Sequence, residues 1–233
     1  MPPARETVLL LHGALGAAAS MVPLAERLAP HFTVHGMDFA GHGAASAPEE
    51  PLSVDLLTAQ VAAYVADHGL APARIFGYSL GGYVALHLAA TRPELVARVA
   101  TLATKMAWTP EVSMQMARQF DVATIRAKAP RFADALAAMH TGVGWEALLG
   151  ATRTMLDDLG ANPRLTPEVL ATISQPVRLG VGDRDVTVSI EETLAAMRTL
   201  PAAELEVHPA TPHALERVDL ERLSTSLVAF LAR

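Results

Sequence analysis

The chain of 233 residues contains no cysteine. Disulfide bridges, thiolate metal sites and a cysteine nucleophile are therefore excluded together. Aromatic residues make up only 5% of the chain, so a hydrophobic core has to be built mainly from Ala, Leu and Val. Lys and Arg number 18 against 24 Asp and Glu, which gives a formal net charge of −6. A nucleic-acid-binding protein normally presents a basic face, so no nucleic-acid partner is expected.

Long apolar runs are also missing. None approaches the roughly 20 residues that a membrane-spanning helix needs. The first apolar stretch, residues 8–11, is too short for the core of a signal peptide and ends in His-Gly. We therefore expect a cytoplasmic protein with no membrane partner. With 51% hydrophobic and 18% charged residues, the chain is still able to bury a substantial core.

Short apolar runs alternate with longer segments of helical periodicity at both ends of the chain. The runs typical of strands are 8–11, 32–37, 74–76, 95–102, 177–181 and 204–207. Helices are expected after a cap at Ser20, from 54 behind the cap Ser53 to Gly69, and over 80–90, 189–200 and about 214–231. Strands that alternate with helices pair in parallel through right-handed crossovers. The sequence predicts an α/β fold with a doubly wound, mainly parallel sheet of about six strands.

A purely helical segment interrupts this alternation after the fourth strand. It runs from Lys105 to about Ala171. Breaks between its helices are expected at Pro110, Pro130, Gly142, Gly144, Gly160 and Pro163.

A serine between two glycines stands where the third strand ends. The pentapeptide is Gly77-Tyr78-Ser79-Leu80-Gly81, with a predicted strand before it and a predicted helix after it. Serine on such a tight turn is held in a strained conformation, and flanking glycines remove side chains that would clash. The helix N-terminus favours negative charge that develops there. We predict that Ser79 is the nucleophile of an ester-type hydrolase; a plain glycine-rich turn is the alternative.

Ser79 requires a base, and nine histidines are available. His213 follows the last strand, in the loop before the final helix, at the sheet edge expected for Ser79. It is the best candidate, and His208 at the end of the last strand is the second. Glycine-flanked loops hold two of the other histidines, His12 and His42, and packed or solvated positions near helices are expected for the remaining five, His31, His35, His68, His87 and His140.

The base in turn requires a carboxylate that orients it. The loop after strand 177–181 reads Gly182-Asp183-Arg184-Asp185, whereas the loop after the fourth strand, 101–105, has no carboxylate. Asp185 has room to point back toward the catalytic loop, and Asp183 is expected to cap or brace the turn. The predicted order of the triad along the chain is Ser79, Asp185, His213.

An oxyanion hole requires backbone N–H groups at the same edge. The loop 12–16 follows the first strand directly, so its N–H groups face this edge. The amide of Leu80, the residue after the nucleophile, is the second donor.

Taken together, these motifs resemble those of the α/β-hydrolase superfamily, in its small, capped, esterase-like branch. The matching motifs are His12-Gly13-x-x-Gly16, Asp38-x-x-Gly41-His42-Gly43, Gly77-Tyr78-Ser79-Leu80-Gly81-Gly82, Gly182-x-x-Asp185 and Pro212-His213. The resemblance implies that Ala14 and Leu80 donate the oxyanion-hole amides. It also implies a helical cap, residues 105–171, inserted after the fourth strand of a core formed by residues 1–104 and 172–233.

The sequence departs from the family pattern in two places. The chain starts almost directly at the strand that carries the oxyanion loop, so the usual first two strands of the family are not expected. This predicts a minimal, all-parallel, six-stranded sheet. Many relatives also carry a serine two residues after Gly-His-Gly, where this chain has Ala45.

Both tryptophans and five of the nine methionines lie in the predicted cap. Most of these side chains are expected to fill the cap's own core. We expect the substrate pocket to include Met106, Trp108 and Trp145. A deformable apolar pocket suits the acyl or alcohol part of an ester.

The resulting hypothesis is a carboxylesterase that cleaves small, fairly apolar esters through an acyl-enzyme, without metal or organic cofactor. A thioesterase, a carbon–carbon bond hydrolase or a lyase would use the same triad. A non-catalytic ligand-binding protein of the same fold is an alternative from another class. A small-molecule ester is the expected partner, and both a monomer and a homodimer remain open.

Overall fold

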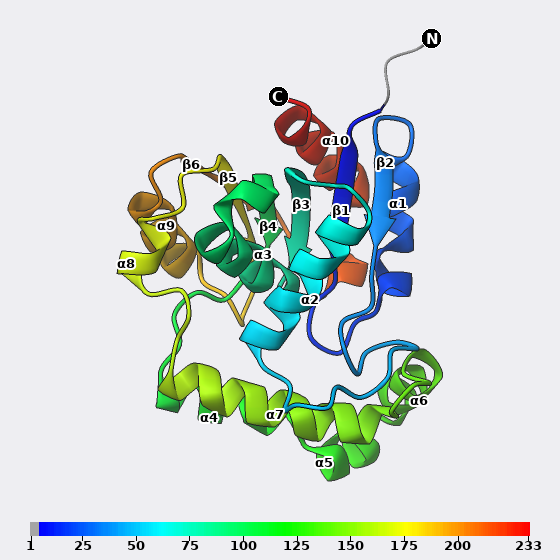
Figure 1. Ribbon diagram of the computed structural model, residues 1–233. Coiled ribbons are helices and arrows are strands. Elements are labelled where there is room, and N and C mark those ends of the chain that lie inside the picture. Colours follow the sequence, from blue (N-terminus) through cyan, green and yellow to red (C-terminus); the bar gives the residue numbers. More distant parts are fainter. Residues whose placement is uncertain (1–4) are drawn as a thin grey trace.

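Six strands form one sheet in the computed structural model, which describes residues 5–233 (Figure 1). Residues 1–4, which begin the segment predicted to lack a signal peptide, lie outside this range. The strands are β1 (Thr7–Leu11), β2 (Thr33–Gly36), β3 (Ala73–Tyr78), β4 (Val96–Leu102), β5 (Val177–Gly182) and β6 (Ala203–His208). All pairs are parallel, in the order β2-β1-β3-β4-β5-β6. The predicted six-stranded parallel sheet is confirmed.

Helices cover both faces of this sheet. They are α1 (Val22–Leu28), α2 (Val54–Asp67), α3 (Leu80–Thr91), α9 (Ile190–Thr199) and α10 (Leu220–Leu231). Side chains alternate along β1: Val8 and Leu10 join a hydrophobic cluster with residues of α1 and α10. Leu9 and Leu11 join the cluster that includes residues of α2, α3 and α9. This period of two is what a strand buried on both faces requires, and it confirms the doubly wound arrangement.

The order of the strands reverses between β1 and β3. The chain leaves β1 for β2 on one side and returns to β3 on the other, so the loops after β1 and β3 diverge at their carboxyl ends. Leu11 at the end of β1 is paired with Gly77 near the end of β3. In open parallel sheets this point of reversal is where ligands bind. The loop 12–16, which follows β1, and Ser79, which follows β3, both lie at this point.

The segment between β4 and β5 is helical, as predicted. It contains α4 (Pro110–Ala117), α5 (Val122–Lys128), α6 (Pro130–Met139), α7 (Trp145–Ala161) and α8 (Pro167–Leu170). Helices α4–α7, called the inserted helices below, form a layer beyond the carboxyl ends of the strands, on the opposite side from the end of α10 (Figure 1). Helix α8 packs on α3 and α9 instead.

The boundaries of the inserted helices follow proline more closely than glycine. Pro110 and Pro130 occupy the first positions of α4 and α6, where a missing N–H costs no helical hydrogen bond. Helix α7 ends at Ala161, one residue beyond the break expected at Gly160. A Cβ at Gly160 would lie 2.3 Å from the Ser113 hydroxyl, so this glycine lets α7 approach α4 closely.

Two predicted helix starts are wrong. The Ser20 side chain exchanges hydrogen bonds with the backbone of Ala17 within a short 3₁₀ helix, and α1 begins only after it, at Val22. The last helix begins at Leu220, with Asp219 as its N-cap, and not near Ala214. Among residues 5–233, none of the helices combines the length and the apolar character that crossing a bilayer requires.

Candidate active site

Ser79 lies on the turn from β3 into α3, with φ of 51° and ψ of −114°. A positive φ is strained for a residue with a side chain, so the surroundings have to enforce it. A Cβ at Gly77 would lie 2.4 Å from the Gly81 carbonyl group, and a Cβ at Gly81 would lie 2.3 Å from the Leu11 carbonyl oxygen. Both positions therefore require glycine, and the turn is sterically tied to the end of β1.

The loop after β4 holds the same turn from its other side. The Ser79 N–H donates to the Leu102 carbonyl oxygen at 2.9 Å. The Thr104 hydroxyl donates to the Ser79 carbonyl oxygen at 3.1 Å. Thr104 was not singled out from the sequence, where its only signal is a position just beyond the fourth strand.

The structure brings the three residues of the predicted triad together. His213 Nε2 lies 3.4 Å from Ser79 Oγ, and His213 Nδ1 lies 2.8 Å from Asp185 Oδ2. The other carboxylate oxygen of Asp185 accepts the N–H groups of Thr187 at 2.7 Å and Val188 at 2.9 Å. An ionised Asp185 holds the proton of His213 on Nδ1, which leaves Nε2 free to accept the proton of Ser79.

The charge state of Asp185 follows from these contacts. Its side chain is fully buried. Burial by itself raises the pKa of the carboxyl group, but the hydrogen bonds from His213, Val188 and Thr187 outweigh burial and place the pKa below its ordinary value. The second candidate base, His208, is buried at the end of β6, with Nε2 3.9 Å from a carboxylate oxygen of Glu206.

Two side chains fix the loop that carries His213. Asp183 Oδ1 accepts the Thr211 N–H at 3.2 Å, and the Arg184 N–H donates to the Thr211 carbonyl oxygen at 3.1 Å. Asp183 therefore braces the loop after β6, and not its own turn as expected. The Tyr78 hydroxyl donates to the His213 carbonyl oxygen at 2.5 Å. Tyr78 directly precedes Ser79, and its side chain thus connects the nucleophile turn to the backbone of His213. No sequence signal indicated this role.

The loop after β1 forms a tight turn beside Ser79. The Gly16 N–H donates to the Gly13 carbonyl oxygen at 3.0 Å, with Ala14 and Leu15 at the centre of the turn, and Leu15 has a φ of 58°. Ala14 and Leu80 line the same cavity as Ser79. Within residues 5–233, neither of their backbone N–H groups donates to an acceptor. Free N–H donors beside a nucleophile are what an oxyanion hole requires.

Two buried histidines support the loops after β1 and β2. His12 donates from Nδ1 to the Gly13 carbonyl oxygen at 2.8 Å and accepts the Phe39 N–H on Nε2 at 3.1 Å. His42 donates from Nδ1 to the Ala40 carbonyl oxygen at 3.1 Å. Burial lowers the pKa of His12 to about 4 and that of His42 to about 3. Both rings are therefore neutral at neutral pH and act as structural hydrogen-bonding groups.

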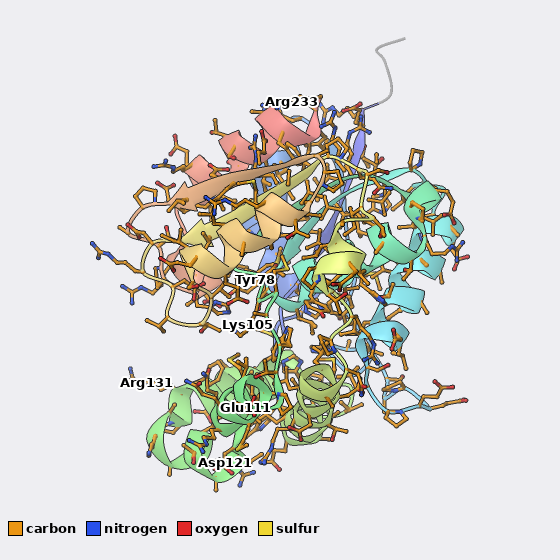
Figure 2. The ribbon with its side chains drawn as sticks, turned by 90° about the vertical axis from the view of Figure 1, so that its left-hand side faces the viewer. Tyr78, Lys105, Glu111, Asp121, Arg131 and Arg233 are labelled. Carbon is orange, nitrogen blue, oxygen red and sulfur yellow. The ribbon has the colours of Figure 1, made fainter. Side chains whose placement is uncertain are left out.

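A cavity of about 430 Å³ lies between the sheet edge and the inserted helices. In Figure 2, Tyr78 and Lys105 lie at the level where the sheet ends and the helical layer begins. Ser79, His213 and the turn of residues 13–16, called the oxyanion turn below, form one wall. The opposite wall is largely apolar and includes Met116, Phe120, Phe132, Leu136, Met139, Met155, Leu156 and Leu159.

Of the three predicted pocket residues, the structure places one on this cavity. Trp108 lines it. Met106 is buried in the core cluster instead, with its backbone N–H held by Glu192 at 2.7 Å. Trp145 packs beneath α5 and α6 in a separate hydrophobic cluster that includes Ile125. Met106 and Trp108 both follow the end of β4, and this position in the sequence does not show which of the two side chains faces the cavity.

Glu192 anchors the entry into the inserted helices, and the sequence gave no sign of this role. One of its carboxylate oxygens accepts the N–H groups of both Met106 and Ala107 at 2.7 Å. The other pairs with Lys105 Nζ at 2.9 Å. Lys105 lines the cavity, and its positive charge is balanced by the largely buried carboxylate of Glu192.

The arrangement supplies the parts that acyl transfer needs. These are a strained serine, an imidazole beside it, a buried carboxylate that orients the imidazole, and two free N–H donors. Within the described part of the chain, no group of three or more His, Asp or Glu side chains is arranged to hold a metal ion.

Comparison with known proteins gives a consistent result. Residues 6–193 match the family model described as the alpha/beta hydrolase fold. The chain is 30% identical, over 97% of its own length and 94% of the relative's, to a pimeloyl-[acyl-carrier protein] methyl ester esterase of Xanthomonas campestris pv. campestris.

Solved structures share the fold at lower sequence identity. A thermophilic esterase from Thermogutta terrifontis matches with a TM-score of 0.79 and 20% identity, over 98% of this chain and 90% of that one. The hydrolase MGS-M2 from a deep-sea metagenome library matches with a TM-score of 0.83 and 16% identity, over 100% and 91% of the two chains. The chain belongs to the alpha/beta hydrolase fold family, and it is an esterase of that family.

Proposed function

We propose that this esterase hydrolyses neutral carboxylic esters with an apolar acyl part, through an acyl-enzyme formed on Ser79. The observation that carries the proposal is the continuous chain of polar contacts from Ser79 through His213 to buried Asp185, at the end of an apolar cavity. Family membership supports the reaction class, and the cavity supports the substrate class.

The proposed first step is attack of Ser79 Oγ on the ester carbonyl carbon. His213 Nε2 takes the serine proton as the new C–O bond forms, and Asp185 stabilises the resulting imidazolium. The separation of 3.4 Å between Nε2 and Oγ is long for a hydrogen bond, and such contacts tighten when substrate binds. The negative oxygen of the tetrahedral intermediate is received by the N–H groups of Ala14 and Leu80.

The second half of the reaction reverses these roles. The imidazolium gives its proton to the departing alcohol as the ester C–O bond breaks. Water then enters, loses a proton to His213 and attacks the acyl-enzyme, which releases the carboxylic acid and restores Ser79.

The chemistry of the cavity supports a neutral, apolar acyl group. Its far wall consists largely of Met, Leu and Phe side chains. Lys105 is already paired with Glu192, and Glu216 adds a carboxyl group to the lining. A carboxylate in the acyl part would be repelled by an ionised Glu216, whereas an ester group would not.

A more specific substrate is favoured by the near full-length relative. That protein's name describes a methyl ester whose acyl chain is attached to an acyl carrier protein. For this chain, the corresponding candidate is the methyl ester of an apolar acyl chain with a carrier protein at its other end. A preference of many-fold in kcat/KM for the carrier-bound methyl ester over the same free methyl ester would support it, and equal values would rule it out.

The alternatives with the same triad are distinguished by substrate. Thioesters, diketones with a cleavable carbon–carbon bond, and lyase substrates are tested beside short p-nitrophenyl esters at matched concentrations. A many-fold preference for one of these classes would overturn the carboxylesterase proposal. Absence of any turnover together with ligand binding would favour a non-catalytic binding protein.

The decisive experiment compares the wild type with Ser79→Ala on p-nitrophenyl butyrate. We expect the variant to lose at least about 10⁴-fold in kcat, because the acyl-enzyme cannot form. A fluorophosphonate probe is expected to label Ser79 in the wild type and to leave the variant unlabelled. Undiminished turnover by Ser79→Ala would remove Ser79 from the mechanism.

A further inference from the structure

His140 lies between the inserted helices and the oxyanion turn, far in sequence from the residues it contacts. It follows α6 directly, and its side chain is buried. Its Nδ1 lies 2.9 Å from the Gly43 backbone nitrogen, and its Nε2 lies 3.0 Å from the Leu15 carbonyl oxygen. A backbone N–H can only donate, so Nδ1 accepts and Nε2 carries the proton that is donated to Leu15.

Only a neutral ring satisfies both contacts, because a protonated ring has no acceptor for the Gly43 N–H. Burial lowers the pKa of His140 below its ordinary value, and it outweighs the hydrogen bond to Leu15 and the charge of Asp38, which act in the opposite direction. The neighbouring histidines, His12 and His42, have lowered pKa values as well. The surroundings therefore favour the neutral form that the geometry requires.

The Leu15 peptide needs external support. Leu15 has a φ of 58°, a conformation that costs free energy for any residue with a side chain. The Gly13 carbonyl, at the start of the turn, is held by the Gly16 N–H and by His12. The Leu15 carbonyl is held by His140. The Gly13–Ala14 peptide is thus held from within the core, and the Leu15–Gly16 peptide is held from the inserted helices.

We propose that His140 is a positioning residue for the oxyanion hole: its Nε2–H group holds the carbonyl of the Leu15–Gly16 peptide, whose N–H in turn holds the Gly13 carbonyl and thereby fixes the direction of the Ala14 N–H in the Gly13–Ala14 peptide. The inference rests on the proposed function, in which that N–H receives the negative oxygen of the intermediate. His140 does not touch the reacting atoms and acts through the turn.

The same segment packs closely on the loop after β2. The Gly142 N–H donates to the Gly43 carbonyl oxygen at 3.2 Å, and a Cβ at Gly142 would lie 2.3 Å from the Ala45 carbonyl oxygen. Leu136 and Met139 line the cavity from α6, immediately before His140. Helix α6, which forms part of the apolar wall of the cavity, is therefore followed directly by His140, the residue that holds the oxyanion turn.

The test replaces His140 by side chains that keep or remove its hydrogen bonds. His140→Gln retains a carbonyl acceptor and N–H donors, whereas His140→Leu retains neither. We expect His140→Leu to lower kcat on p-nitrophenyl butyrate about 10- to 100-fold, somewhat less than complete loss of an oxyanion donor. KM stays within about threefold, because the donor acts mainly in the transition state. His140→Gln recovers most of kcat.

A second measurement separates positioning from general loosening. The affinity of a boronic acid, which forms a tetrahedral adduct on the serine, is expected to fall in parallel with kcat in His140→Leu. The affinity of butyrate, the planar product, stays near the wild-type value. If His140→Leu does not fold, His140→Met is the second apolar variant, and its kcat is compared with that of His140→Gln.

The matched control loosens another attachment of the inserted helices. Arg164 follows α7 and pairs with Asp55 and Asp158, away from the oxyanion turn. Arg164→Gln is expected to lower the melting temperature slightly and to leave kcat unchanged.

Three results would overturn the inference. They are a kcat of the apolar His140 variant within twofold of wild type, a His140→Gln variant no better than the apolar one, and an equal loss of kcat in Arg164→Gln. If Ser79→Ala is inactive while the apolar His140 variant is fully active, only this inference fails. If Ser79→Ala keeps wild-type turnover, the proposed function itself fails.

Discussion

The two walls of the cavity are built in different ways. On the sheet side, Ser79 and the neighbouring turns are fixed by backbone contacts, by glycines without room for a Cβ and by polar side chains whose partners are specified. On the side of the inserted helices, the lining is mainly Met, Leu and Phe, and Phe132 is 48% exposed. Directional contacts tolerate little change, whereas flexible apolar side chains adapt to their neighbours. The reacting groups and the apolar acyl lining therefore lie on different walls, which are joined where His140 contacts the turn after β1.

After the loss of Ser79 itself, the largest effect is expected at the carboxylate of the sheet side. Asp185→Asn keeps the shape of the side chain but no longer stabilises the Nδ1–H tautomer of His213 or its imidazolium form. We expect kcat to fall by about 10³- to 10⁴-fold with little change in fold. Steady-state kinetics on p-nitrophenyl butyrate and circular dichroism measure the two properties. A loss below tenfold would show that His213 does not depend on Asp185.

A pair of glycines tests the steric part of the comparison. Gly81→Ala is expected to lower the free energy of unfolding by about 2–4 kcal/mol, because its Cβ would lie 2.3 Å from the Leu11 carbonyl oxygen. Gly150→Ala in α7 is the control, since no heavy atom lies within 4 Å of its Cβ position. The control is expected to gain about 0.5–1 kcal/mol. Urea unfolding of both variants decides, and equal midpoints would contradict the steric argument.

The buried histidines of the sheet side predict acid sensitivity. His12 and His42 take up protons near pH 6.5 when unfolded, but only near pH 4 and pH 3 when folded. The unfolded chain therefore binds more protons below pH 6.5, and the free energy of unfolding falls as the pH is lowered. His12 alone accounts for a loss on the order of 3 kcal/mol between pH 6.5 and 4.

Urea unfolding at pH 7.5, 6.0 and 5.0 measures this decline. His42→Phe is expected to make it shallower, because one of the two groups no longer titrates. His42 Nε2 has no hydrogen-bond partner among residues 5–233, so the variant gives up only the bond from Nδ1 to Ala40. Equal midpoints at pH 7.5 and 5.0 would contradict the prediction.

The smallest effects are expected on the side of the inserted helices, where the two tryptophans form a matched pair. Trp108→Leu is expected to shift the ratio of kcat/KM for octanoate over butyrate esters about tenfold toward the longer chain, because Trp108 lines the cavity. Trp145→Leu is expected to cost about 2 kcal/mol of stability without changing that ratio, because Trp145 is buried and does not line the cavity. An equal shift of the ratio in both variants would remove the distinction between them.

Most of the sheet and its loops could be predicted because the signals are local. The apolar runs mark the strands, and the elbow around Ser79 lies between a strand and a helix, as its glycines require. Asp185 and His213 follow from parallel pairing, since the carboxyl ends of β5 and β6 lie at the same edge as that of β3. The strands, the turn that carries Ser79 and the loops that carry Asp185 and His213 can each be recognised from a short stretch of sequence.

The missed features depend on contacts between distant segments. Nothing near His140 in the sequence indicates that its ring meets Leu15 and Gly43. The Met106 side chain is buried in the core, and its backbone N–H is held by Glu192. Glu192 lies in α9, which follows the whole insertion in the sequence. The late start of the last helix reflects the better cap that Asp219 provides, with its carboxylate accepting two backbone N–H groups. Periodicity does not carry information of this kind.

The insertion between β4 and β5 also determines when the molecule becomes active. Val99 of β4 pairs with Val177 of β5 across the whole helical insertion, so this joint of the sheet forms by long-range closure of the chain. A nascent polypeptide exposes Ser79 well before the ribosome has made Asp185 and His213. The proposed triad is therefore complete only after the part of the chain that follows the insertion has docked on β4. During refolding, we expect the recovery of esterase activity to lag behind the early helical signal.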